Sequence, residues 1–367
     1  MGRDLLFKLG LIGAVVLASV VLAIPPREKV HLGLDLQGGL HLLLEVQVDK
    51  AIERTLERRA EALRKDLGAK GLPVVAVEPN GLQGLRMVFS KPPEKSVVEE
   101  VVRNQDPSSI VQQQTPEVWL YSVPASEIQL FRASAVDQAL EKIRNRIDAF
   151  GVSEPSISRE GTQRIVVQLP GLTDTKRAID LIGKTAQLEL KMVHSQASSP
   201  TATPPPGTQL LFMKKKDPRT GQLMDAGAYF VERRAAVSGD MLADARAVPD
   251  PSTGQYYVLM RLDSRGKKIF ERVTRENVGK AMAIALDDTI FSAPVIQEPI
   301  PGGEARITGS FTPEEARDLA IVLREGALPA PVTIVENRAV GPSLGSDSIV
   351  KGCGRHCWAV AWWSYFY

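Results

Sequence analysis

Residues 32–46 read LGLDLQGGLHLLLEV, and the fold of the chain is built around this stretch. Residues 40–46 alternate as a half-buried β-strand does, and residues 31–34 are also strand-like. The glycine-rich segment between them predicts a turn that lets the chain leave one strand and enter the next. A phosphate-binding loop would need a Lys-Ser/Thr pair and a following helix, so nucleotide binding is disfavoured. The residues assigned to this structural turn are Gly33, Asp35, Gln37, Gly38 and Gly39.

Helices and further strands follow at the spacing of an α+β fold. Apolar residues at intervals of three and four predict a helix over 51–68 and a longer one from Ser126 to a stop at Gly151. Strands are predicted at 74–77, 85–89, 118–121, 155–158, 164–169 and 186–193, with shorter helices at 94–102 and 174–182. The order strand–helix–strand–strand–helix–strand thus occurs roughly twice, which is the ferredoxin-like (βαββαβ) pattern. Residues 31–194 are therefore predicted to form a base of ferredoxin-like units.

A second α+β domain is predicted beyond the base. Residues 195–207 (SQASSPTATPPPG) are rich in Pro, Ser and Thr, which is typical of a domain boundary. The domain, called the head, is assigned to residues 195–330. Its last helix has Thr312 at the N-cap and Glu315 three residues later, the pattern of a capping box. Residues 331–351 are predicted to return to the base.

The amino-terminal end is predicted to be a transmembrane helix over residues 9–26, preceded by a short segment at 1–8. Residues 9–24 carry no charge, and with residues 5–8 they reach the about 30 Å of a bilayer core. A cleaved signal peptide is the alternative, but Pro25-Pro26 and the lack of an A-x-A signature favour a retained anchor. The flanking positive charges balance, so they leave the orientation open.

The carboxyl-terminal end, residues 352–367, differs in composition from the rest of the chain. It holds both cysteines and three of the four tryptophans. Cys353, His356 and Cys357 lack a fourth ligand elsewhere and make a poor metal site. We interpret this segment as an anomalous tail, frame-shifted or artificial, with an aromatic membrane-interface segment as the alternative.

Composition and motifs exclude several classes of function. Lys and Arg number 45 against 43 Asp and Glu, so the chain lacks the basic field that nucleic-acid binding needs. No H-E-x-x-H or C-x-x-C motif is present. Asp287 and Asp288 lie between apolar strands and are interpreted as a β-turn rather than a catalytic pair. We therefore expect no catalytic residue, no metal, no cofactor and no enzymatic activity.

Two sets of residues in the head are candidates for function. Because proline fixes φ, rotation of the head is expected at the joints beside its prolines. The hinge candidates are Val193, Gly326, Pro329 and Pro331. An unfolded polypeptide offers backbone groups and scattered apolar side chains, so an apolar surface suits it. The candidate substrate patch is Leu211, Phe212, Met213, Tyr229 and Phe230, for which the alternative is a role as core strands.

Several long motifs, in order along the chain, resemble the SecD family of bacterial Sec translocon subunits. Besides LGLDLQGGLHLLLEV they are ALEKIRNRIDAFGVSEPSI (139–157), RIVVQLPGL (164–172), AQLELKMV (186–193) and LREGALPAPV…VGPSLGSDSI (323–349). The resemblance covers about residues 1–351. It implies a cytoplasmic amino terminus, an inner-membrane anchor and a periplasmic bulk with a ferredoxin-like base and an inserted head. In the family, further membrane helices hold the proton-relay residues, so none of those residues can be assigned here.

The resemblance implies an auxiliary subunit of the Sec preprotein translocase that helps to pull or release translocating polypeptide by means of the proton motive force. The partners it implies are SecF, SecYEG and YajC, with unfolded preproteins as substrate, membrane lipid around the anchor and no nucleic acid. The chain as written is expected not to couple protons by itself. The alternative is a membrane-tethered adaptor or periplasmic domain of an efflux assembly.

Overall fold

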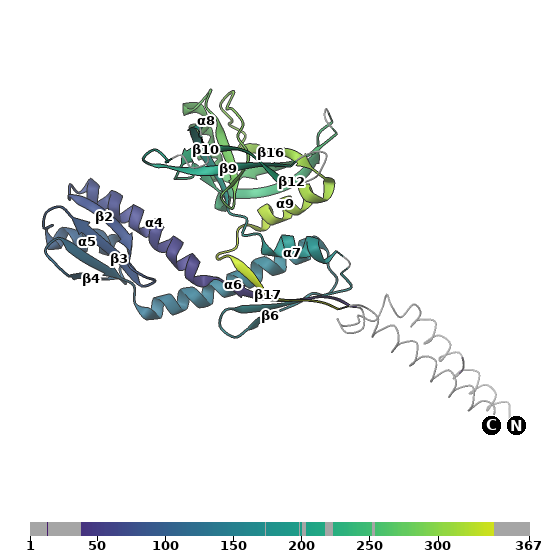
Figure 1. The fold of residues 1–367 in the computed structure, drawn as a ribbon, viewed down its shortest axis with the longest axis horizontal. Coiled ribbons are helices and arrows are strands. Elements are labelled where there is room, and N and C mark those ends of the chain that lie inside the picture. The colour runs from purple at the N-terminus through teal and green to yellow at the C-terminus, as the bar shows by residue number, and fades with distance from the viewer. Residues whose placement is uncertain are drawn as a thin grey trace.

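The computed structural model describes Gly13 and residues 38–340, except for residues 173, 198, 200–202, 217–222 and 252–253. Three groups of predicted features lie outside the described residues: the segment 9–26 apart from Gly13, the turn residues Gly33, Asp35 and Gln37, and the tail 352–367. No helix in the described part is both long and apolar enough to cross a membrane. Figure 1 shows a base, a lobe beside it and a head above it.

The base is one ferredoxin-like unit whose strands come from distant parts of the chain. Its elements are β1 (Gly39–Val46), α6 (Ala125–Phe150), β6 (Ser156–Glu160), β7 (Arg164–Pro170), α7 (Thr175–Gly183) and β17 (Val332–Val340). The sheet has the order β17-β1-β7-β6 with all neighbours antiparallel, as in a βαββαβ unit. Leu40, Leu42 and Leu44 are fully buried, so the alternation predicted for this strand is confirmed. Gly38 and Gly39 before and at its start have φ of 71° and 139°, a region that favours glycine.

A smaller lobe is inserted between β1 and α6. It consists of α4 (Val48–Ala69), β2 (Val74–Pro79), β3 (Gly84–Phe89), α5 (Lys95–Gln105), β4 (Ile110–Gln113) and β5 (Val118–Ser122). Its sheet has the antiparallel order β2-β3-β5-β4. If β5 is taken as the first strand, α4, β2, β3, α5 and β4 follow in βαββαβ order, so the lobe is a cyclic permutation of the same topology. Helix α4, about 33 Å long, runs from the base to the lobe (Figure 1).

The prediction of two consecutive βαββαβ units is therefore corrected in its assignment of strands. It grouped β1 with the helix and strands that immediately follow it, whereas β1 pairs with β7 and β17. Leu42, for example, lies opposite Asn337 at the far end of the described chain. Apolar periodicity reports which residues are buried along one strand, but it carries no information about distant partners.

The head begins with a sheet that closes on itself. Its strands are β8 (Leu188–Gln196), β9 (Thr208–Lys216), β10 (Leu223–Glu232), β14 (Met282–Leu286) and β15 (Thr289–Ser292). They follow the order β10-β9-β15-β14-β8, and β8 pairs in addition with β10, so the ring of pairings is complete. The interior of this five-stranded barrel is filled by Leu211, Val231, Ala283, Ala285 and Ile290. Alanines suit so narrow an interior, because small barrels are packed with side chains.

A second sheet and two helices pack on the outside of the barrel. The second sheet consists of β12 (Leu242–Pro249), β13 (Tyr256–Leu262) and β16 (Glu304–Phe311), and the helices are α8 (Ser264–Glu276) and α9 (Pro313–Glu325). The short strand β11 (Val237–Ser238) pairs with β8 and is followed by the 3₁₀ turn η1 (Gly239–Met241). The second sheet has the order β12-β13-β16, so β16 is an edge strand. The capping box predicted for α9 is confirmed, because the side chains of Thr312 and Glu315 each accept the other's backbone N–H.

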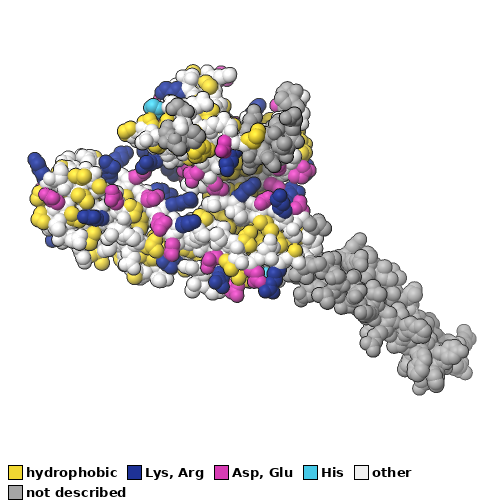
Figure 2. All heavy atoms as spheres, viewed as in Figure 1, with side chains coloured by type: hydrophobic (Ala, Val, Ile, Leu, Met, Phe, Trp, Pro, Cys, Tyr) yellow, Lys and Arg dark blue, Asp and Glu magenta, His cyan; other side chains and the backbone are white. Residues whose placement is uncertain are grey.

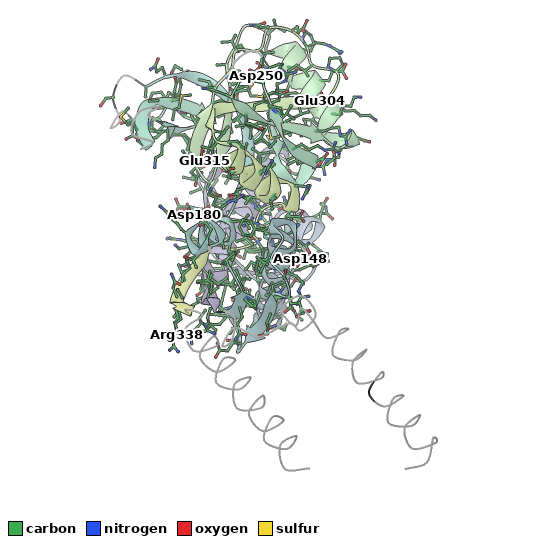
Figure 3. All side chains as sticks on the ribbon, turned by 90° about the vertical axis from the view of Figure 1, so that its right-hand side faces the viewer. Asp148, Asp180, Asp250, Glu304, Glu315 and Arg338 are labelled. Atoms are coloured by element: carbon green, nitrogen blue, oxygen red, sulfur yellow. The ribbon has the colours of Figure 1, made fainter. Side chains whose placement is uncertain are left out.

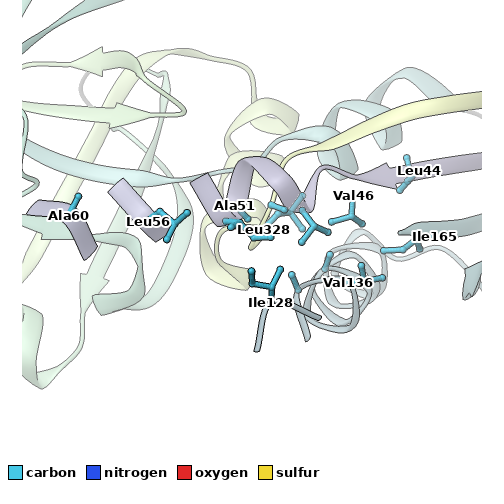
Figure 4. Packing of buried hydrophobic residues seen from close by; sticks show 14 of the residues in the cluster. Leu44, Val46, Ala51, Leu56, Ala60, Ile128, Val136, Ile165 and Leu328 are labelled. Atoms are coloured by element: carbon cyan, nitrogen blue, oxygen red, sulfur yellow. The ribbon is translucent and has the colours of Figure 1, made fainter. Parts of the chain in front are cut away.

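The chain enters the head through Lys184–Gln187 and leaves it at Gly326–Ala327. The predicted boundary at residue 195 is corrected, because β8 pairs with β14, β10 and β11 and so belongs to the head. The two crossings touch, since the N–H of Leu328 donates to the carbonyl of Thr185 at 2.9 Å. Leu328 itself is buried in the core of the base, beside Ala51 and Ile128 (Figure 4). The head is thus joined to the base at one narrow junction.

Candidate functional site

The junction is held by a buried arginine from α6. The guanidinium of Arg146 is fully buried and donates to four carbonyl oxygens: those of Lys184 (2.5 Å), Leu181 (3.2 Å), Gly326 (2.9 Å) and Thr185 (3.4 Å). The carbonyl of Leu181 lies in α7 and the other three lie on the two crossings, so one side chain binds both crossings. Burial lowers the pKa of Arg146 to about 10, against the opposing effect of Asp287 and Glu325, so the group stays charged near neutral pH.

A second cation one turn earlier in α6 binds the end of α9. The Nζ of Lys142 donates to the carbonyl of Glu325 at 2.6 Å. Together with Arg146 it satisfies two carbonyls at the carboxyl end of α9, where helix carbonyls lack partners and carry partial negative charge. This pairing ties the last helix of the head to the long helix of the base.

The entry crossing is held from the head side by Asp287. Its carboxylate accepts the N–H of Ala186 and of Gln187, each at 2.9 Å. Asp287 and Asp288 have φ of 48° and 60° in the turn between β14 and β15, so the predicted turn is confirmed. Ala186 has φ of 61°, which is unusual for a residue with a Cβ. The crossing is therefore fixed in a conformation that its own sequence disfavours.

An ion pair beside the junction docks α9 on the base. Arg177 of α7 binds both carboxylate oxygens of Asp318 at 2.6 and 2.7 Å and stacks 5.0 Å from the ring of Phe150. The hydrogen bonds to Asp318 raise the pKa of Arg177. Side chains of both charges gather along the boundary between head and base (Figure 2). Because both side chains keep contact with water, this ion pair adds only modestly to the stability of the docked head.

The predicted hinge residues are separated by the structure. Val193 lies inside β8, opposite Val231, and its N–H donates to the carbonyl of Ala281, so it is not at the junction. Gly326 is at the junction, where it ends α9 with φ of 82°. Pro329 and Pro331 lie past the junction in the base, and the carbonyl of Pro331 accepts the N–H of Gln47. The predicted hinge did not include the entry crossing Lys184–Gln187 or Arg146, which binds both crossings.

The predicted substrate patch is also divided. Leu211, Met213 and Tyr229 pack in the barrel interior. Phe212 points the opposite way and is 37% exposed, while Phe230 is buried outside that interior. Successive residues of a strand face opposite sides, so five residues taken from two paired strands cannot form one surface. The expectation of one continuous patch is wrong.

A cleft elsewhere in the head offers an apolar surface. It has a volume of about 510 Å³ and lies between the barrel, α8, residues 294–300 and the edge of β16. Its apolar walls belong to the main core of the head and comprise Leu190, Phe270, Met282, Ile284, Ile296 and Ile300. Val295 stands at the rim with 57% of its surface exposed. The sequence signal for this site is the run PVIQEPIP at 294–301, where prolines hold apolar residues out of a regular strand.

Comparisons with known proteins identify the family of this chain. Residues 212–330 match the family described as SecDF, P1 head subdomain, and residues 136–195 match protein translocase subunit SecDF, P1 domain, N-terminal. A protein translocase subunit SecD from Desulfurispirillum indicum is 43% identical over 96% of this chain and 69% of its own length. The chain belongs to the SecD family. A SecD from Syntrophobacter fumaroxidans is 44% identical over 89% of this chain and 63% of its own length, so the chain spans about two thirds of such relatives.

A solved structure shares the fold of this chain. The crystal structure of SecDF in super-membrane-facing form has 29% sequence identity and a TM-score of 0.51, and the match covers 96% of this chain and 37% of that one. The α+β base and inserted head therefore correspond to the P1 region of SecDF.

Proposed function

We propose that this chain acts as an auxiliary subunit of the bacterial Sec preprotein translocase, with its head binding the emerging polypeptide. The observation that carries the proposal is the apolar cleft in the head of a SecD-family chain. Apolar surface rimmed by polar residues suits an unfolded chain, which presents scattered apolar side chains and no fixed shape. In this proposal the chain binds and releases polypeptide and catalyses no reaction.

The narrow junction supports a role in movement. A head joined through two short crossings can turn as a rigid body if the contacts of α9 with the base open. We propose that the proton motive force drives this turning, with SecF, SecYEG and YajC as partners, an amino terminus in the cytoplasm and the described residues in the periplasm.

Site-specific photocrosslinking during export tests the proposal. A photoreactive residue is placed at Phe212, Met224 or Val295, which are exposed on the head, and as a control at Leu130, which is 71% exposed on α6 of the base. The proposal predicts adducts with an arriving preprotein from the head and not from Leu130. Adducts with an efflux channel instead would favour the efflux-assembly alternative, and no adduct with preprotein from any head position would contradict the proposal.

A reversible lock tests the movement separately. Cysteines replacing Arg177 and Asp318, joined by a cleavable crosslinker, would fix α9 on the base at its present contact. Export should slow while the lock is closed and recover when it is cleaved. Equal export in both states, with the crosslink verified, would show that the head need not move.

A further inference from the structure

The edge of β16 that faces the cleft has free hydrogen-bonding groups. In an antiparallel ladder, alternate residues direct their N–H and C=O to the partner strand and away from it. The carbonyl of Gly303 accepts the N–H of Leu262 in β13, and Ala305 and Ile307 continue that register opposite Met260 and Val258. The backbone groups of Glu304, Arg306 and Thr308 therefore point away from β13. In the described part of the chain, no strand pairs with this edge.

The same residues line the cleft. Glu304, Ala305, Arg306 and Thr308 form one wall, and the opposite side leads into the apolar core of the head. An exposed edge strand is a template for another extended chain, which it binds through main-chain hydrogen bonds. Side chains on one face of an added strand would then reach the apolar walls. Main-chain hydrogen bonds do not depend on the side chains of the ligand, so a site that combines them with one apolar pocket can bind many sequences. A binding site for translocated polypeptides needs this breadth.

The charges at the cleft select among extended chains. Glu298 and Glu304 line it, and among the described residues neither forms an ion pair. Arg306 lines the cleft as well, but its guanidinium lies 5.1 Å from the ring of Tyr257 and forms no ion pair with either carboxylate, so two negative charges face one positive charge there. Figure 3 shows Glu304 in the head, far from Asp148 and Asp180 of the base. The cleft is thus acidic at its rim and complements a basic side chain.

Resting on the function proposed above, we propose that an extended polypeptide segment binds by adding a strand to the free edge of β16 at Glu304–Thr308. One apolar side chain of the segment enters the cleft, and a neighbouring Lys or Arg lies beside Glu298 and Glu304. The ligand class is therefore an unfolded segment in which an apolar residue is flanked by basic ones.

Backbone-modified peptides test the strand addition. The full chain is titrated with a fluorescent peptide that has a central Leu and flanking Lys residues, and with two versions N-methylated at alternate amides. Only one face of an added strand bonds to β16, so one version should lose about tenfold or more in affinity, the effect of two or more lost hydrogen bonds. The other should bind nearly as the parent does. Equal losses in both versions, or none in either, would overturn the proposed mode.

Two substitutions at one position test the same edge from the protein side. Arg306→Pro removes an N–H that points away from β13, so the existing ladder is kept. It should bind the parent peptide about fivefold more weakly than Arg306→Gln, which removes the same charge and keeps the N–H, as one lost hydrogen bond predicts. Thermal unfolding of both variants checks that the sheet is intact. If an intact Arg306→Pro variant binds like Arg306→Gln, the edge does not take part.

Charge reversal in the ligand tests the selectivity. In a Glu298→Gln, Glu304→Gln double variant the Lys-flanked peptide should bind about threefold more weakly, and a Glu-flanked peptide should gain, as expected for exposed ion pairs. The same change for both peptides would overturn the proposed selectivity. If these peptide tests fail while preprotein still crosslinks to the head, this site is wrong and the proposed function stands. If no preprotein crosslinks to the head, the function itself is wrong.

Discussion

The two sides of the head differ in how their polar groups are satisfied. On the side of α9, Arg146, Lys142 and Asp287 bind carbonyls and N–H groups of both crossings at 2.5–3.4 Å. Among the three guanidinium nitrogens of Arg146, only Nε has no hydrogen-bond partner among the described residues. On the side of β16, the backbone of one strand faces an apolar cleft and two carboxylates lack ion-pair partners among the described residues. On the α9 side the polar groups find their hydrogen-bond partners within the chain. On the β16 side the backbone groups and carboxylates could be paired by a second chain.

This contrast separates stability from binding. Substitutions at the junction should alter the free energy of unfolding and leave peptide affinity at the cleft unchanged, whereas substitutions at the cleft should do the reverse. Matched variants at the junction and at the cleft can test that separation.

The largest effect is expected at Arg146. Replacing it with Met in the full chain removes the side-chain donor to four carbonyls near the crossings, of which that of Thr185 keeps the N–H of Leu328. The change should lower the free energy of unfolding by about 3 kcal/mol. Urea unfolding followed by circular dichroism measures the loss. The control is Arg144→Met on the same helix, where the exposed side chain makes one 3.3 Å bond to the carbonyl of Ile157. Equal losses in the two variants would contradict the role given to Arg146.

Backbone conformation at the exit crossing gives the next largest effect. Gly326 has φ of 82° and ψ of 176°, a region that only glycine occupies readily, so Gly326→Ala should destabilise by about 2 kcal/mol. A Cβ there would also lie 3.3 Å from the Nζ of Lys142. Gly68→Ala in α4 meets no atom within 4 Å and should instead stabilise by up to about 1 kcal/mol, since alanine is the better helix former. Unfolding midpoints that shift in the same direction would refute this assignment.

The ion pair between Arg177 and Asp318 should contribute less, because both side chains keep contact with solvent. Asp318→Asn should lower stability by about 1 kcal/mol, and the difference should shrink as salt is added. Hydrogen exchange along α9 measures the loosening of the head from the base. Exchange that is unchanged in α9 would show that Arg146 and Lys142 dock the helix without help.

Sequence patterns found the features that depend on neighbours along the chain. The alternation of residues 40–46, the capping box at Thr312 and the turn at Asp287 need only a few consecutive residues, and each is confirmed. The pairing of β1 with β17 and the closure of the barrel through β8 and β10 join distant segments. The local periodicity of a strand does not indicate which distant strand pairs with it, so these features were missed or misassigned.

Arg146 had a signal that could have been read. It falls three residues after Ile143 and four before Phe150, on the apolar stripe of its helix. A cation at such a position must be solvated by buried acceptors, which indicates a polar junction inside the protein. The cleft has only a partial signal in the sequence, the run PVIQEPIP at 294–301. Its walls come from β8, α8, β14, β16 and the loop 294–300, and only folding brings them together.

The smallest effect on stability, and the sharpest test of the contrast, is expected at Val295. Because this side chain is more than half exposed, Val295→Ala should change the free energy of unfolding by no more than about 0.5 kcal/mol. The affinity for the Lys-flanked peptide should nevertheless fall about threefold, since the valine would be covered by the bound strand. Val278→Ala is the control, because Val278 is 49% exposed on the head and does not line the cleft. Fluorescence titration of both variants compares them directly. If both substitutions lower the affinity for the peptide equally, the peptide does not bind at the cleft. The proposed addition of a strand to the edge of β16 would then be wrong.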